Sequence, residues 1–311
     1  MNRLRLWERF SLVRDMLSSS RGGRSMVKRK TLARCACCGS DAFVSLSDTV
    51  KAAQCPGCGV IFNYERPAWK DEPADADTYV EYDRFRPDHK WEKMWRFRYA
   101  RVQALFPPTP ARPRLLDVGT GIGTFLALVR EQFDVCGVEP SLAGVRKARE
   151  LYGLEIIHGS LEDAGYPEKS FDAITMWHVF EHLPYPGATL GLCRRLLKQD
   201  GKLFIAVPNS SLCRVVLNPV YWCAARDKRL AMRGVVPYEE GMVDLHVTHH
   251  APRSLKGLLE RFGFQVMDLD LDKTSLNPGL KTDLKYTVRH HFIRLFGCNP
   301  FKTILAVARA V

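Results

Sequence analysis

A ten-residue run from Leu115 to Thr124, Leu-Leu-Asp-Val-Gly-Thr-Gly-Ile-Gly-Thr, restricts the fold of this chain more than any other feature. Apolar residues suited to a buried strand lead directly into three glycines at alternate positions, and a helical pattern follows. Glycine tolerates positive φ angles and lets the backbone approach a ligand closely. The helix behind such a loop presents free N–H groups and the positive end of its dipole. The run predicts a strand–loop–helix unit with a ligand site at the glycine loop (119–123).

Short apolar segments alternate with amphipathic segments over the rest of the C-terminal part. The helical spacing is clearest at Leu255, Leu258, Leu259 and Phe262. Continuous apolar strands are expected where helices cover both faces of a parallel sheet. The predicted strands are Arg114–Val118, Val135–Val138, Glu155–His158, Ala173–Met176, Lys202–Val207, Gln265–Leu271 and Thr303–Ala310. We therefore predict a doubly wound α/β fold.

The spacing within and beyond the glycine loop bears on its ligand. A dinucleotide fingerprint would need Gly or Ala at position 124, where this chain has Thr124. Glu139 follows Gly119 by 20 residues, and a carboxylate there can accept hydrogen bonds from ribose hydroxyls. The small, polar and apolar residues 158–163 after the third strand can frame an adenine ring. Each feature alone is compatible with an ordinary turn, but their joint spacing favours an adenosine-containing cofactor.

Residues 109–311 resemble a class I methyltransferase dependent on S-adenosylmethionine (SAM). Segments that carry the resemblance include LLDVGTGIGTFL, VCGVEPS, IIHGSLED, FDAITMWHVFEHL, LLKQDGKLFIAVPN and APRSLKGLLERFGF, in the family's order. The resemblance implies a Rossmann-like sheet of seven strands, ordered 3-2-1-4-5-7-6, with strand seven antiparallel.

The resemblance also implies a set of cofactor-binding residues. The aminoacyl end of SAM would be surrounded by Asp117, Gly119 and Gly121, and its ribose would be held by Glu139. Ser160 and Leu161 would face the adenine, and Trp177 and His178 would lie beside the cofactor. The complete predicted set is Asp117, Gly119, Thr120, Gly121, Glu139, Pro140, Ser160, Leu161, Trp177 and His178.

Two Cys-x-x-Cys pairs precede the α/β part. Cys35 and Cys38 form the first pair, Cys55 and Cys58 the second, and a glycine follows each pair. Such pairs at this separation are typical of tetrahedral zinc sites, with unligated core cysteines as the alternative. Residues 31–66, the cysteine module, are too few to hold together without metal, and we expect a core separate from that of the α/β part. The architecture resembles bacterial methyltransferases with an N-terminal zinc ribbon.

The positive charge is concentrated at the N-terminus. Residues 1–34 carry ten Lys and Arg against two acids, which accounts for most of the net charge of +12. A basic groove over the catalytic part, as expected for a nucleic-acid substrate, is therefore not indicated. Arg84, Arg98 and their neighbours nevertheless form a local basic helix. The favoured acceptor is a small molecule or glycan, methylated at a hydroxyl. The alternatives are an RNA or protein methyltransferase that docks through the cysteine module and basic tail, and a SAM-binding protein without catalysis.

Several histidines are candidates for a general base, which a hydroxyl acceptor benefits from. His246 is the preferred candidate, although a structural loop histidine is the alternative. Quinone-biosynthesis relatives carry Glu-x-x-Glu-His after strand four and bind a divalent metal, whereas this chain has His178 at the first position. We therefore favour a loop-orienting role for Glu181 and His182 and leave a second metal site open. Aromatic residues of 79–99 and 212–243 are expected to roof the acceptor pocket, or simply to form core.

Four segments follow from these patterns: a basic tail and linker (1–30), the cysteine module (31–66), a connecting helical segment (67–108) and the methyltransferase domain (109–311). Residues 1–17 have the pattern of an amphipathic helix, which can contact a membrane surface, a partner or the protein itself. No apolar run is long enough to cross a bilayer. Paired cysteines without a signal-peptide pattern indicate a reducing, cytoplasmic location. The oligomeric state is not predicted.

Overall fold

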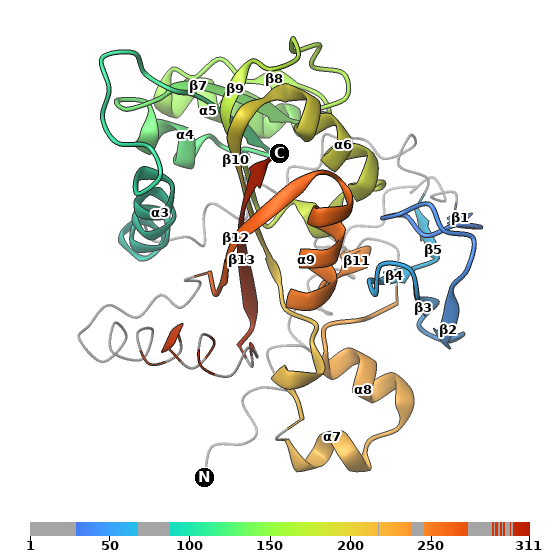
Figure 1. The fold of residues 1–311 in the computed structure, drawn as a ribbon. Helices are drawn as coiled ribbons and strands as arrows, with labels where there is room; N and C mark the ends of the chain where they lie inside the picture. The colour runs from blue at the N-terminus through green and yellow to red at the C-terminus, as the bar shows by residue number, and fades with distance from the viewer. Residues whose placement is uncertain are drawn as a thin grey trace, which may run out of the picture.

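The computed structural model describes residues 29–67, 88–216, 218–237, 246–272 and 301–311, and positions 288, 290, 291, 293, 295 and 299. Its main body is a seven-stranded sheet with helices on both faces (Figure 1). In order across the sheet, the strands are β12 (Phe264–Asp270), β13 (Thr303–Ala310), β10 (Leu197–Pro208), β9 (Phe171–Trp177), β6 (Arg114–Val118), β7 (Asp134–Glu139) and β8 (Ile157–His158). Strand β13 is antiparallel to both neighbours, and the remaining pairs are parallel. This order confirms the predicted fold class.

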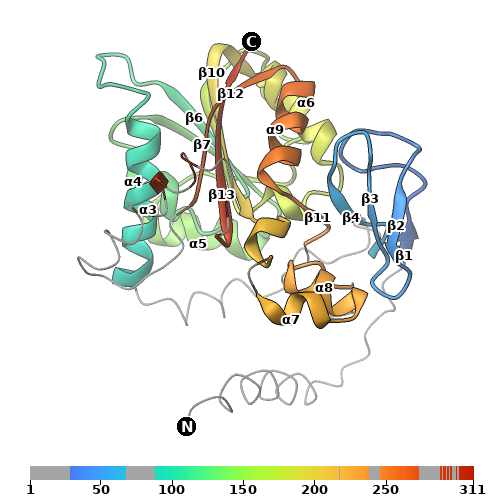
Figure 2. The same cartoon turned by 60° about the horizontal axis from the view of Figure 1, so that its bottom comes forward.

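Successive residues of the central strands point to opposite faces of the sheet, and each face has its own buried cluster. Leu115 and Phe204 belong to one cluster, whereas their neighbours Leu116 and Ile205 belong to the other. Figure 2 shows α3 and α4 on one side of the sheet and α6 and α9 on the other. The helices of the first face are α3 (Asp88–Gln103), α4 (Thr124–Val129) and α5 (Leu142–Tyr152), and those of the second are α6 (Pro186–Leu196) and α9 (Pro252–Arg261).

Two helices show why the sequence folds in this way locally. Helix α5 begins after Ser141, whose side chain accepts a hydrogen bond from the N–H of Gly144, and ends at left-handed Gly153. Helix α9 buries the predicted apolar stripe, including Leu255 and Leu258. The predicted apolar periodicity of this helix is therefore confirmed.

The edge strand β8 is shorter than predicted. It begins at Ile157 rather than Glu155, because only Ile157 and His158 pair with β7. Glu155 lies outside the ladder with its side chain exposed and ion-paired to Arg149 at 2.7 Å. An edge strand has a partner on one side alone, so its unpaired residues are free to leave the sheet.

The segment after β10 contains two short helices, α7 (Pro219–Cys223) and α8 (Arg226–Met232). Tyr221 is buried there, whereas Trp222 is exposed. The remaining predicted roof residues between 79 and 87 and between 238 and 243 lie outside the described residues, as does the predicted helix over 1–17. Within the described ranges, no helix is both long and apolar enough to span a membrane.

The cysteine module does not stand apart from the main body. Its strands are β1 (Arg29–Thr31), β2 (Val44–Ser47), β3 (Ala52–Gln54), β4 (Ile61–Asn63) and β5 (Glu65–Pro67). Strands β2, β3 and β4 form a four-stranded sheet with β11 (Thr248–His249), which belongs to the C-terminal part (Figure 1). The buried side chains of Val60 and Phe62 join the same cluster as Leu255 of α9. The expectation of a separate core is therefore wrong, because the module buries apolar side chains against the main body on one side and, through Ile61, against Leu230 of α8 on the other.

Candidate functional site

The glycine loop turns sharply at the end of β6. Gly119, Gly121 and Gly123 have φ angles of 68°, 56° and 79°, a region that favours glycine. A Cβ atom on Gly119 would lie 2.5 Å from Cγ2 of Val179, so the loop after β9 packs directly on this glycine. Among the described residues, none comes within 4 Å of a Cβ placed on Gly121, which leaves the backbone open to a ligand at this point.

Glu139 ends β7 and faces the glycine loop. Its two carboxylate oxygens accept hydrogen bonds from the N–H of Gly121 at 2.7 Å and of Ser141 at 2.9 Å. Burial raises the pKa of Glu139, and these two amides oppose the shift. Each oxygen keeps a second lone pair, so the carboxylate can also accept from hydroxyls of a bound ribose. The open glycine backbone fits the aminoacyl end of SAM, and this fixed acceptor fits its ribose.

The other predicted cofactor residues lie at the same edge of the sheet, because the carboxyl ends of β6, β7, β8 and β9 meet there. Asp117 is buried and accepts a hydrogen bond from Thr175 at 2.5 Å, and burial raises the pKa of Asp117 to about 7. The carbonyl of Pro140 lies 3.0 Å from Nε2 of His158. Thr120 and Leu161 are buried.

Ser160 and Trp177 complete the predicted set beside His178. The Ser160 hydroxyl donates to Asp163 at 2.6 Å. The indole Nε1 of Trp177 is buried and has no hydrogen-bond partner among the described residues. A buried donor of this kind is available to a bound molecule. The sheet thus gathers all ten predicted residues at one edge, and their contacts with SAM remain a prediction.

A buried charged network lies behind the loop after β9. Arg98 of α3 donates to both carboxylate oxygens of Asp272, at 3.2 and 2.6 Å. Nε2 of His178 lies 3.1 Å from Asp272, and its Nδ1 lies 3.4 Å from Glu181. Arg98 belongs to the predicted local basic helix, yet its side chain is only 2% exposed. No sequence pattern marked Asp272 as a functional residue, apart from its position just after the sixth predicted strand.

This network fixes the charge of His178. Burial of the ring opposes protonation, but the adjacent carboxylates of Asp272 and Glu181 raise the pKa of His178 to about 9. Burial would raise the pKa of Asp272, but Arg98 and His178 hold it well below its usual range. His178 therefore carries its proton at neutral pH and cannot serve as a base there. Its backbone has a φ of 58°, a left-handed conformation uncommon outside glycine.

Glu181 is surrounded by histidines. Its buried Oε1 lies 3.9 Å from Nε2 of His182 and 4.0 Å from Nε2 of His246, in addition to His178. Burial opposes ionisation, yet His178 and the other rings lower the pKa of Glu181. Glu181, His182 and His246 place their ligand atoms within 4.8 Å of one another, a set that can also hold a divalent cation.

Two further histidines of the 246–250 segment are held inside the protein. His249 and His250 are fully buried, and burial lowers their pKa values to about 3 and about 4. Nε2 of His249 lies 2.8 Å from Oδ1 of Asn63, and Nε2 of His250 lies 3.0 Å from the Thr248 hydroxyl. Neither ring is positioned to take a proton from a substrate.

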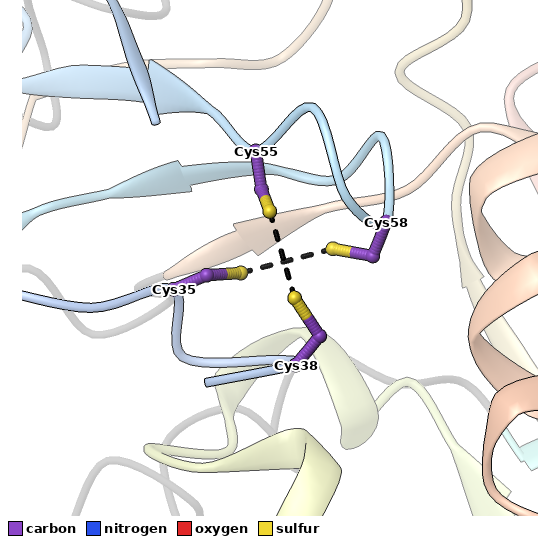
Figure 3. A group of neighbouring side chains, drawn as sticks. All are labelled: Cys35, Cys38, Cys55 and Cys58. Atoms are coloured by element: carbon purple, nitrogen blue, oxygen red, sulfur yellow. Dashed lines mark hydrogen bonds between the residues drawn. The ribbon is translucent and has the colours of Figure 1, made fainter. Parts of the chain in front are cut away.

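The four paired cysteines converge on one point (Figure 3). Their sulfur atoms lie within 4.8 Å of one another, with 3.7 Å between Cys35 and Cys58 and 3.5 Å between Cys38 and Cys55. A tetrahedral Zn²⁺ with Zn–S bonds of about 2.3 Å separates its sulfurs by about 3.8 Å. The donor set and its spacing therefore fit zinc. Cys37, between the first pair, is buried and lies outside the set.

Matching turns present these sulfurs. The N–H of Gly39 donates to the carbonyl of Cys35 at 2.9 Å, and the N–H of Gly59 donates to Cys55 at 2.7 Å. Both glycines adopt positive φ angles, 74° and 73°. The glycine after each pair is thus required by the turn that carries the ligands.

Comparison with known proteins agrees with this geometry. A family model described as a methyltransferase domain matches residues 82–269. A ubiquinone biosynthesis O-methyltransferase of Xanthomonas axonopodis pv. citri (strain 306) is 31% identical over 167 residues, which are 51% of this chain and 66% of that protein. The Nitrosococcus oceani protein of the same name is 35% identical over 133 residues, 40% of this chain and 54% of that protein. The chain thus spans between about half and two thirds of the length of these relatives.

A solved structure shares the fold. It is the complex between the Haloferax volcanii Trm112 methyltransferase activator and a methyltransferase, with a TM-score of 0.50 and 20% identity over 75% of this chain and 95% of that chain. At this identity the likeness bears on the fold alone. The family match covers more than half the sequence, and the strand order and glycine loop agree with it. The chain belongs to the class I SAM-dependent methyltransferase family.

Proposed function

We propose that this protein transfers a methyl group from SAM to a hydroxyl of a small-molecule or glycan acceptor. The observation that best supports this function is the position of the buried Glu181 carboxylate, which lies beside partly exposed histidines and next to the glycine loop. Val179 connects the two parts, because it packs on Gly119 and lies between His178 and Glu181. The relatives named O-methyltransferases support an oxygen acceptor.

The residues at the sheet edge would hold the cofactor. When bound, SAM supplies an electrophilic methyl group on its sulfonium. The open backbone at Gly121 would face the aminoacyl end, and Glu139 would hold the ribose while keeping its bonds to the loop. Such positioning supports methyl transfer because the main requirement is alignment of the acceptor oxygen with the methyl group.

His246 is the proposed general base. The positive charge of His178 and the burial of His249 and His250 leave His182 and His246 beside Glu181. The side chain of His246 is 24% exposed, and its Nε2 lies 4.0 Å from the Glu181 carboxylate. A carboxylate at this distance favours the imidazolium that forms when the ring takes the hydroxyl proton.

A methyl-transfer screen with isotopically labelled SAM and a panel of hydroxylated small molecules and glycans tests this function. With a positive acceptor, His246→Ala should lower turnover by about 10²–10⁴-fold, because removal of a general base has this effect. The dissociation constant of S-adenosylhomocysteine should stay nearly unchanged. His182→Ala is the matched control, since it removes a ring at nearly the same distance from Glu181.

Two outcomes would oppose the proposal. Equal losses of turnover and S-adenosylhomocysteine binding in His246→Ala would assign that histidine a structural role. Methylation of bulk RNA that disappears with removal of the basic residues 1–30 would support the alternative of an RNA methyltransferase.

We further propose that Cys35, Cys38, Cys55 and Cys58 bind one structural Zn²⁺. The convergence of their sulfurs at tetrahedral spacing supports this. Elemental analysis of protein purified without chelator should find one zinc per chain, and Cys55→Ser should lose it. Cys193→Ser is the control, because this buried cysteine lies outside the cluster. Absence of stoichiometric metal in the wild-type protein would refute the assignment.

A further inference from the structure

The segment that carries His246 is held from two sides. On one side, β11 pairs with β4 of the cysteine module, and the N–H of Asn63 donates to the carbonyl of Val247 at 3.0 Å. On the other side, the N–H of Val247 donates to the carbonyl of Glu181 at 2.9 Å. The residue next to His246 is therefore bonded both to the cysteine module and to the turn that presents Glu181.

A buried side-chain hydrogen bond reinforces the strand pairing. The amide nitrogen of Asn63 donates to the carbonyls of Val50 at 3.1 Å and Val236 at 2.9 Å, so Oδ1 of Asn63 is the acceptor for His249. His249 must therefore carry a proton on Nε2. Burial lowers the pKa of His249 to about 3, so the ring is neutral and donates from that nitrogen. Removal of the ring would leave a buried acceptor unsatisfied.

The strand that receives β11 adjoins the proposed metal site. Strand β3 ends one residue before Cys55, and β4 begins three residues after Cys58. A metal at the four cysteines would tie this hairpin to the first pair of cysteines. That pair rests on α6, where a Cβ on Gly187 would lie 2.0 Å from the carbonyl oxygen of Cys37. The hairpin is thereby anchored to the main body.

We propose that the cysteine module holds residues 246–250 in place, and that Asn63 and His249 are positioning residues for His246. Metal at the four cysteines would hold β4 in place. The β4–β11 pairing and the Asn63–His249 hydrogen bond would then hold residues 246–250 against β4. The roles of His246 and of the metal rest on the proposed function, whereas the link between β4 and this strand does not depend on it.

Hydrogen–deuterium exchange of the full zinc-loaded chain, read by mass spectrometry, tests the link without an acceptor. In His249→Phe, which keeps a ring but no donor, protection of the amides of 246–250 should fall at least tenfold. In His249→Gln, whose amide nitrogen can occupy the position of Nε2, protection should be largely restored. Removal of zinc from the wild-type protein by a chelator should lower protection of the same segment.

The central strands and the cofactor site provide the internal controls. Protection of β6 and β7 and the dissociation constant of S-adenosylhomocysteine should change less than threefold in both variants, with one zinc retained per chain. Unchanged protection of 246–250 in His249→Phe would overturn the proposal. Equal loss of protection in β6 and β7 would also overturn it, because the bond would then support the fold as a whole.

Discussion

At the residue scale, Glu139 combines two roles, since it orders the glycine loop and is poised to accept from ribose hydroxyls. Glu139→Ala removes the acceptor for the N–H groups of Gly121 and Ser141 as well as the proposed ribose contact. We expect S-adenosylhomocysteine binding to weaken by about 1.5–3 kcal/mol, the range for hydrogen bonds to a charged group. Isothermal titration calorimetry measures this loss directly.

The matched control is Glu155→Ala. Glu155 is an exposed acid that precedes the neighbouring strand β8, and it forms an ion pair with exposed Arg149. This substitution should leave the affinity unchanged within error. Wild-type affinity in Glu139→Ala would exclude the ribose contact, and tight NAD binding without S-adenosylhomocysteine binding would exclude the cofactor assignment.

His178 makes stability depend on pH in the alkaline range. Its folded-state pKa of about 9 lies above the value of about 6.5 expected when unfolded, so the folded protein binds the proton more tightly. The stabilisation is complete below pH 6.5 and disappears as the pH rises through 9, with a loss of at most about 3 kcal/mol. The free energy of unfolding from urea titrations at pH 6.5 to 9.5 tests this.

The comparison variant for this pH dependence is His178→Asn. Asparagine tolerates the left-handed backbone at this position but does not titrate. Asp272 and Glu181 have lowered pKa values, so their contributions change only at acid pH, outside this window. Parallel pH profiles of variant and wild type between pH 6.5 and 9.5 would show that His178 is not charged in the folded protein.

The cofactor-binding residues could be predicted from the sequence, whereas the buried Arg98–Asp272 ion pair could not. The acids and glycines of the cofactor edge follow from strand-end spacing, because parallel strands bring their carboxyl ends together. Arg98 and Asp272 are 174 positions apart and meet only through the packing of α3 against the end of β12. Neither residue has a local pattern that separates a buried ion pair from a solvated charge.

At the scale of elements, the contact between α6 and the first cysteine turn is tight enough to test. Gly187→Ala would place a methyl group 2.0 Å from the Cys37 carbonyl oxygen, and backbone cannot yield cheaply. We expect a destabilisation of about 1–3 kcal/mol, the usual cost of overpacking, together with weaker zinc retention. Urea unfolding and competition with a zinc chelator measure the two effects.

Gly191→Ala in the same helix is the control. In the part of the chain that the structure describes, its Cβ would meet a ring carbon of Phe262 at 4.0 Å, an ordinary contact. Because alanine is the better helix former, this change should stabilise the protein by up to about 1 kcal/mol. Equal effects of the two substitutions would mean that the cysteine turn does not rest on α6.

The strands differ in how well the sequence predicts them. All strands of the main sheet except β8 have five residues or more, and the predicted order is confirmed. Strand β11 was not predicted, because two residues, Thr248 and His249, provide no periodicity. Its pairing depends on β4, which lies 185 positions or more away in the chain, so no local pattern indicates it. The three histidines of this segment therefore suggested a site by their chemistry but not by their arrangement.

At the scale of the whole molecule, the continuous buried cluster changes what metal removal should do. Separate cores would let the cysteine module unfold alone and leave the main sheet unaffected. The buried side chains of Cys55, Val60 and Phe62 instead belong to one cluster with Leu255 and Ile205. Apolar surface of the main body is thus covered by the module, and its exposure would cost free energy in both parts.

Zinc concentration should therefore control the unfolding of the main sheet. A ligand that binds only the folded state adds about 2.7 kcal/mol to the free energy of unfolding at 100 times its dissociation constant. We expect the urea midpoint from far-UV circular dichroism, which reports mostly on the large α/β body, to rise with buffered free zinc and to coincide with zinc release detected by a chromogenic chelator. Cys55→Ser should abolish the dependence. Cys193→Ser should retain it, because Cys193 is a buried residue of α6 that lies outside the set of four paired cysteines. A midpoint of the main sheet that is independent of zinc, with metal release at lower urea, would instead show that the two parts unfold separately despite their shared core.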